Sequence, residues 1–165
     1  MTRAFRSLAM LAAIAMLVLA GCGGSGGNNL DPPEITYGED VSEMGMFVTD
    51  PRYTVAALPE EGEWILFDDI GELFRYRVRH PEQAFQATWV NDYHSEEWLA
   101  AEDAWYLQSV DLSSPMGWGV AAFRDEDAAR AFQVEHGGEL MTWADTGGRE
   151  WTDPPAPEGV EHERH

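Results

Sequence analysis

The central part of the chain carries apolar positions in two patterns, one typical of helices and one typical of strands. The apolar residues Ile70, Leu73 and Phe74 are spaced as on one face of a helix. Asp68 precedes them, and aspartate is one of the residues that commonly cap the start of a helix. This pattern predicts a helix from Asp68 to about Val78. Short apolar runs around it predict strands at Phe47-Val48, Tyr53 to Ala57, Trp64 to Phe67 and Phe85 to Val90.

The second half of the chain repeats this order of elements. Asp125 is the predicted cap of a helix that ends near Glu135, and Gly137-Gly138 separates that helix from the next strand. The predicted strands here are Trp105 to Val110, Trp118 to Phe123 and Glu139 to Trp143. The sequence therefore predicts an α+β fold, in which two similar ββαβ halves, near residues 45–92 and 103–144, pack into one compact domain.

The N-terminal segment has the pattern of a bacterial lipoprotein signal. Arg3 and Arg6 precede an apolar run over residues 8–20, which is too short to span a bilayer comfortably, and the small residues before Cys22 suit a cleavage site. Cys22 is the chain's only cysteine and is the expected site of lipid attachment. We therefore expect an extracytoplasmic protein, anchored by its lipid to the outer or the inner membrane.

These features divide the chain into four parts. They are a signal peptide over 1–21, a lipid-anchored flexible linker over 22–34, an α+β domain over 35–151 and a Pro-rich, charged tail over 152–165 that we expect to be disordered. Acylation of Cys22 would leave no thiol in the mature chain. That excludes disulfides, thiolate nucleophiles and cysteine metal sites.

The chain is strongly acidic and contains no lysine. Its formal net charge is −20 at pH 7. Residues 1–21 hold two arginines and no acidic residue, so their removal leaves 8 basic against 30 acidic residues, a net charge of −22. This balance argues against nucleic acid and against anionic membrane surfaces as partners. A solvated acidic surface gives the same negative charge, so acidity by itself identifies no metal.

Three methionines lie in turn-rich sequence, whereas methionines that fill a core usually sit in periodic apolar segments. They are Met44 and Met46, on either side of Gly45, and Met116 in the string Ser114-Pro115-Met116-Gly117. An extended Met-Gly-Met would place both side chains on one face, with α-carbons about 6–7 Å apart. Thioether sulfur is soft and neutral and selects Cu(I) over zinc, calcium or magnesium. The spacing leaves two interpretations open, a Cu(I) site and ordinary packing.

Other candidate groups are weaker. His94, in the connection between the halves, is a candidate nitrogen ligand, although a single histidine in a polar loop also fits plain solvent exposure. Asp68 and Asp69 resemble a catalytic carboxylate pair. Their place at a helix start favours capping, since a carboxylate there accepts hydrogen bonds from free amides and complements the helix dipole.

Five short strings follow one another through the folded region. They are Met44 to Tyr53 (MGMFVTDPRY), Phe67 to Gly71 (FDDIG), Trp89 to Tyr93 (WVNDY), Ala104 to Tyr106 (AWY) and Pro115 to Gly119 (PMGWG). In this order they resemble the NosL family of lipid-anchored copper chaperones for nitrous-oxide reductase. The resemblance implies two ββαβ halves, distantly similar to organomercurial lyase. It also implies one bound Cu(I), delivered to the catalytic copper site of the reductase or to its assembly machinery, and no enzymatic activity.

The chain departs from the family pattern at one point. The family usually has Cys-Gly-Met where this chain has Met44-Gly45-Met46. The resemblance makes Met46 and Met116 copper ligands, and Met44 takes the place of the cysteine by inference. A site of three neutral thioethers does not cancel the charge of Cu(I), so we expect weaker binding than with a thiolate. Because thioethers carry no exchangeable proton, we also expect an affinity that is nearly flat with pH.

Two other functions stay open. The protein could be a copper chaperone for a different extracytoplasmic cuproenzyme, or a metal-free interaction or assembly lipoprotein that lost copper together with the family cysteine. Lyase chemistry is not expected, because it depends on thiolates that the mature chain lacks.

Overall fold

The first half of the chain builds a four-stranded antiparallel sheet. In the computed structural model, which describes residues 30–152, its elements are η1 (Pro51–Tyr53), β1 (Val55–Pro59), β2 (Ile65–Phe67), α1 (Ile70–Arg79), β3 (Phe85–Asn91) and β4 (Trp98–Ala100). The strand order is β2-β1-β3-β4, so that β1 pairs with both β2 and β3. Strand β2 is therefore an edge strand.

The second half builds a three-stranded antiparallel sheet with the same connectivity. After η2 (Ala101–Asp103), its elements are β5 (Trp105–Gln108), β6 (Val120–Phe123), α2 (Glu126–His136), β7 (Glu139–Thr142) and α3 (Trp143–Gly147). The order β6-β5-β7 corresponds to β2-β1-β3 in the first half, because the first strand of each unit lies in the middle. The prediction of an α+β fold with two ββαβ halves is confirmed.

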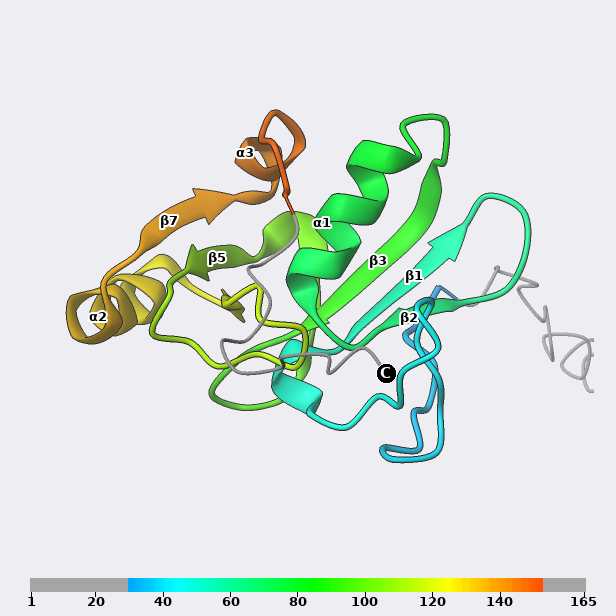
Figure 1. Ribbon diagram of the computed structural model, residues 1–165, viewed down its shortest axis with the longest axis horizontal. Coiled ribbons are helices and arrows are strands. Elements are labelled where there is room, and N and C mark those ends of the chain that lie inside the picture. Colours follow the sequence, from blue (N-terminus) through cyan, green and yellow to red (C-terminus); the bar gives the residue numbers. More distant parts are fainter. Residues whose placement is uncertain (1–29, 153–165) are drawn as a thin grey trace, which may run out of the picture.

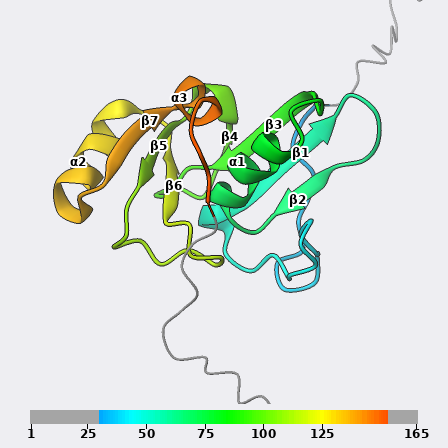
Figure 2. The same cartoon turned by 45° about the horizontal axis from the view of Figure 1, so that its top comes forward.

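Helix α1 lies between the two halves, and α2 covers the outer face of the second sheet (Figures 1 and 2). Along β5, successive side chains point to opposite faces. Tyr106 belongs to the larger core, which α1 shares with both sheets, and Leu107 belongs to a smaller core beneath α2. The larger core joins the halves through buried residues of both, among them Val55, Phe67, Phe74, Val90, Val120, Ala122 and Met141.

Both helices begin at an aspartate, as predicted, but the first does so one residue later than expected. The cap of α1 is Asp69, whose Oδ1 accepts a hydrogen bond from the Gly71 amide at 3.0 Å. The prediction of Asp68 as the cap was wrong, because the extended backbone that precedes the helix includes Asp69. Asp125 caps α2 as predicted, accepting from the Ala128 amide at 2.9 Å.

Several strand boundaries also differ from the predictions. Phe47 forms only an isolated bridge with Val41, and Tyr53 lies in η1, because Asp50 caps a 3-10 turn there. Strand β7 ends at Thr142, where a capping box with Asp145 starts α3. Strands β5 and β6 are shorter than predicted, since the long connection between them begins after Gln108 and ends before Val120.

The predicted signal peptide and most of the predicted linker and tail lie outside residues 30–152, and so does Cys22. Within the described range, none of the helices is both long enough and apolar enough to cross a bilayer.

Candidate metal centre

Met44 and Met46 lie at the tip of a narrow hairpin. The Ser42 amide donates to the Met46 carbonyl at 2.7 Å, and the Gly45 amide donates to the Ser42 carbonyl at 2.9 Å. This is a three-residue hairpin loop, and its last position requires the left-handed conformation that Gly45 adopts, with φ of +81°. The expected extended Met-Gly-Met is therefore wrong. A turn, rather than a strand, places the two methionines.

The hairpin tip is exposed and apolar. Met44 and Met46 are 52% and 51% exposed, and the bridge partners Val41 and Phe47 are 50% and 59% exposed. Methionine, valine and phenylalanine are residues that folded proteins most often bury. The two thioethers are thus accessible to an ion or to another molecule without any rearrangement of the fold.

Met116 lies in the connection between β5 and β6, in a loop that Asp69 holds in place. Oδ2 of Asp69 accepts from the Ser114 hydroxyl at 2.6 Å and from the Met116 amide at 3.0 Å. The Ser114 hydroxyl in turn accepts from the Gly119 amide at 2.8 Å. Met116 itself is partly buried against the larger core. The same carboxylate therefore caps α1 and fixes the Met116 loop.

The two methionine loops are anchored on one short segment. The amide of Glu43, directly before Met44, donates to the carbonyl of Leu66 in β2 at 2.8 Å. Met116 is held by Asp69. These anchor residues are three positions apart, so they lie at most about 11 Å from each other. The fold thus brings sequence positions 44 and 116 to the same strand-to-helix connection.

This connection is rich in buried carboxyl groups. Burial raises the pKa of Asp69, and the hydrogen bonds from Ser114, Gly71 and Met116 oppose that effect. Burial also raises the pKa of Glu72 to about 8, helped by contact with Asp68 and by the negative charges of Asp68, Glu43 and Asp69. The buried carboxyl groups beside the methionine loops therefore keep their protons to higher pH than exposed carboxyl groups do.

His94 lies elsewhere. Its exposed ring packs against Phe123 and Phe132, with centroid distances of 5.4 and 5.8 Å, and both phenylalanines belong to the smaller core beneath α2. Met116 packs on the other face of the second sheet, against the larger core. The structure thus brings Met116 to the anchor of the Met44 and Met46 hairpin, but places His94 on the α2 side. Its role as a ligand stays a prediction.

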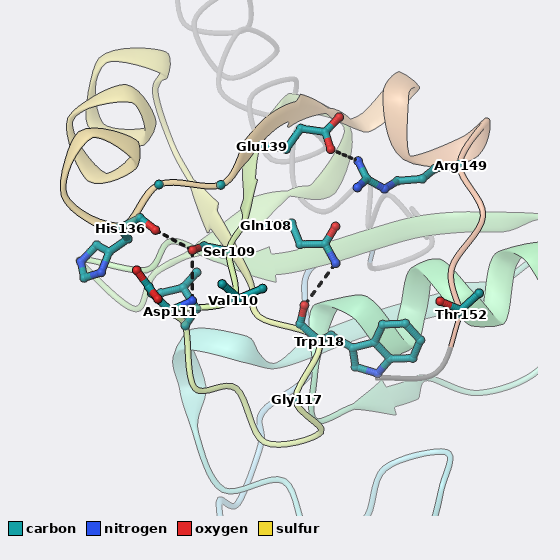
Figure 3. A pocket seen from close by; sticks show the side chains of 13 residues that line it. Gln108, Ser109, Val110, Asp111, Gly117, Trp118, His136, Glu139, Arg149 and Thr152 are labelled. Carbon is teal, nitrogen blue, oxygen red and sulfur yellow. Dashed lines mark hydrogen bonds and ion pairs between the residues drawn. The ribbon is translucent and has the colours of Figure 1, made fainter. Parts of the chain in front are cut away.

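A hollow of about 740 Å³ lies beside the end of β5 and the connection from α2 to β7 (Figure 3). Several of its polar side chains are paired with neighbouring groups. The Ser109 hydroxyl donates to the His136 carbonyl at 2.6 Å, and Arg149 forms an ion pair with Glu139 at 2.6 Å. None of the described residues that line the hollow is a methionine.

Within residues 30–152, no group of three or more His, Cys, Asp or Glu side chains is placed to hold a metal ion. Thioether sulfur is therefore the donor type that the candidate centre provides. Sequence reasoning missed the carboxyl group of Glu72. Its only sequence signal is its place in the first turn of a helix, where acidic residues are common.

Comparison with known proteins agrees with this architecture. The fold is similar to that in the crystal structure of the copper chaperone NosL from Shewanella denitrificans, with a TM-score of 0.64. The two sequences are 19% identical, and the match covers 70% of this chain and 95% of the other. The sequence model of the NosL family matches residues 32–149, and the chain therefore belongs to the NosL family. None of the curated proteins matches it.

Proposed function

We propose that this protein is a Cu(I) carrier that delivers copper, outside the cytoplasm, to nitrous-oxide reductase or to its assembly machinery. Membership of the NosL family and the likeness to a solved copper chaperone support copper as the cargo and carriage, rather than catalysis, as the activity. The observation that carries the proposal is the common anchor of the two methionine loops, where the Glu43 amide bonds Leu66 and the Met116 amide bonds Asp69.

In this proposal Met44, Met46 and Met116 supply the sulfur ligands. The hairpin tip receives the ion, because its thioethers are half exposed. The Met116 loop offers a third sulfur from a position fixed by two hydrogen bonds to Asp69. Soft, neutral donors of this type favour Cu(I) and discriminate against Zn(II).

The ligand assignment is tested by the double variant Met46→Leu/Met116→Leu. Leucine keeps most of the volume and apolarity, so the fold should survive with a loss of less than about 1.5 kcal/mol. Competition against a Cu(I) chelator should show at least a tenfold loss of affinity, equivalent to about 1.4 kcal/mol. Met141→Leu is the matched control, because this methionine lies in the core at 2% exposure and should leave copper binding unchanged. Unchanged binding in the double variant would show that the site is wrong.

We also propose that Cys22 carries the lipid that holds the protein at the membrane. The variant Cys22→Ser should be exported but not acylated, because only lipid attachment uses that thiol. Fractionation should therefore move the protein from the membrane pellet to the soluble extracytoplasmic fraction. If it stayed in the pellet after a high-salt wash, another part of the chain would be the anchor.

One observation favours a second function, in which the protein acts through contact without metal. Val41 and Phe47 form a bridge at the base of the hairpin tip, and both are exposed. Such a surface suits a protein partner. A chain that binds no Cu(I), yet binds the reductase or its assembly proteins through this hairpin, would establish the second function. If the protein transferred copper to another cuproenzyme and not to the reductase, the carrier function would stand and only the receiving enzyme would differ.

A further inference from the structure

Two acidic side chains at the start of α1 are buried with unpaired oxygen atoms. Asp68 and Glu72 are 3% and 6% exposed. Oδ1 of Asp68 and both carboxyl oxygens of Glu72 have no hydrogen-bond donor among the described residues. Their neighbour Asp69 is equally buried but accepts three hydrogen bonds. Buried polar groups are rarely left without a partner, so these three atoms need an explanation.

Glu72 lies one helical turn after Asp68, and contact with Asp68 is one of the causes that raise its pKa. Two ionised carboxylates offer only acceptors, so this contact becomes a hydrogen bond only when one of them keeps its proton. Glu72 is the group that keeps it, because burial and the neighbouring negative charges raise its pKa to about 8. In the metal-free protein at neutral pH, Glu72 therefore keeps a proton that it can donate to Asp68.

The pair lies between the anchors of the two methionine loops. Asp69, which follows Asp68, holds the Met116 amide. The charge of Glu43 acts on Glu72, and it adds to the burial that raises the pKa of Tyr76, one turn further along α1. The charges that raise the pKa of Glu72 come from Asp68, Glu43 and Asp69. The guanidinium of Arg75 lies over the Trp118 ring, at 6.0 Å.

This arrangement determines what a bound cation would do. Glu43 directly precedes Met44, and its negative charge strengthens the hold of Glu72 on its proton. A positive ion held by the methionine loops, which are anchored at Leu66 and Asp69 on either side of Asp68, acts with the opposite sign and so favours loss of that proton. The protein interior screens such an effect less than water does.

We propose that Asp68 and Glu72 exchange one proton for one copper ion, so that the buried pair supplies the negative charge that the thioether ligands lack. The inference rests on the copper-carrier function proposed above. When Cu(I) binds, Glu72 releases its proton to solvent and the pair gains one negative charge. One positive charge enters and one leaves, so the net charge of the region stays the same. Asp68 and Glu72 are positioning residues for the ion and do not ligate it.

The first test is the pH dependence of Cu(I) affinity in the acylated protein in detergent, corrected for protonation of the chelator. Between pH 6 and pH 8 the affinity should rise, by up to about tenfold per pH unit, and above pH 8 it should level off. This slope replaces the nearly flat dependence that the thioether ligands alone would give. Glu72→Gln should remove the slope, because glutamine has no proton to release. Its amide can still donate to Asp68, so the fold is expected to persist. The control Glu126→Gln, in the first turn of α2, should keep the slope.

The second test needs no copper. Carboxyl carbon NMR of the metal-free protein should show Glu72 titrating near pH 8, and Asp68→Asn should lower that midpoint because it removes the neighbouring charge. A Glu72 midpoint below pH 6 would overturn the inference. So would copper binding that is flat with pH, or a slope that persists in Glu72→Gln, and in both cases the carrier function would stand. Absence of Cu(I) binding at every pH would overturn the carrier function and the exchange together.

Discussion

The two helices start in the same topological place, after the second strand of each ββαβ half, but in opposite environments. Before α1, Asp68 and Asp69 are buried beneath the two methionine loops. Before α2, the corresponding connection reads Arg124-Asp125 and faces solvent, where Arg124 pairs with Glu97 at 3.1 Å. Both helices have an aspartate cap with similar geometry. The hydrogen bond at the helix start is therefore the same, and the difference lies in what covers it.

The acidic residues at the start of the two helices differ in how strongly solvent screens them. At α2, solvent screens the acidic residues of the first turn, and Glu126 forms an i,i+4 ion pair with Arg130. At α1, the covering loops exclude water, so that Asp69 becomes a crosslink between distant segments and Glu72 keeps a proton near neutral pH. An acidic helix start thus acquires function when another part of the chain buries it.

The largest expected effect is on the two caps. Asp69→Ala should destabilise the protein by about 3 kcal/mol, because it removes the α1 cap and leaves the Ser114 hydroxyl and the Met116 amide without their acceptor. Asp125→Ala should cost about 1 kcal/mol, the usual value for a cap alone. Urea unfolding of both variants gives the comparison. Equal losses would show that Asp69 has no role beyond capping.

A smaller effect is expected from Glu72→Gln, and it depends on pH. The pKa of Glu72 is about 8 in the folded chain, against 4.5 for the free side chain. The folded state therefore holds the proton more tightly, and its stabilising effect is complete below about pH 4.5 and disappears as the pH rises toward 8. Glutamine does not titrate. Relative to the parent, the variant should change little at pH 5 and gain about 1–3 kcal/mol at pH 8.

Thermal or urea unfolding at several pH values measures this gain. The smallest effect is expected from the matched variant Glu126→Gln, which should stay within about 0.5 kcal/mol of the parent at each pH, because its carboxylate is exposed and its ion pair is screened. A gain at pH 8 of the same size in both variants would mean that general charge reduction, rather than burial of Glu72, is responsible.

Local sequence signals predicted most of the fold. Both helices were placed to within two residues at each end, because acidic caps and helical spacing of apolar residues are short-range features. The ββαβ order common to both halves was also predicted, since each of its strands is a short apolar run bounded by turn residues. Strand β4 and helix α3 were not predicted, and the strand expected at Phe47-Val48 is only an isolated bridge. From this order the two ββαβ halves followed.

The details of the candidate site depended on contacts between distant segments. Asp68 and Asp69 are equally good caps by sequence. In the structure the cap is Asp69, which also accepts hydrogen bonds from Ser114 and Met116, more than 40 positions away. Burial raises the pKa of Glu72, and the charge of Glu43 on the distant hairpin adds to this effect; the helix pattern shows neither. The sequence placed Met44 and Met46 in a turn-rich segment, but it did not decide between an extended Met-Gly-Met and a hairpin tip.

The half-exposed hairpin also bears on how fast cargo can move. An ion bound at a buried site leaves only after the protein opens, so its release rate is independent of the receiver. At the proposed site both methionine side chains are half exposed, so a receiving sulfur or nitrogen could attach to the ion before Met44 and Met46 release it. Transfer would then be associative ligand exchange, and its rate would grow with the concentration of the receiving protein. Such a carrier would lose copper slowly in isolation and quickly on encounter with its receiver.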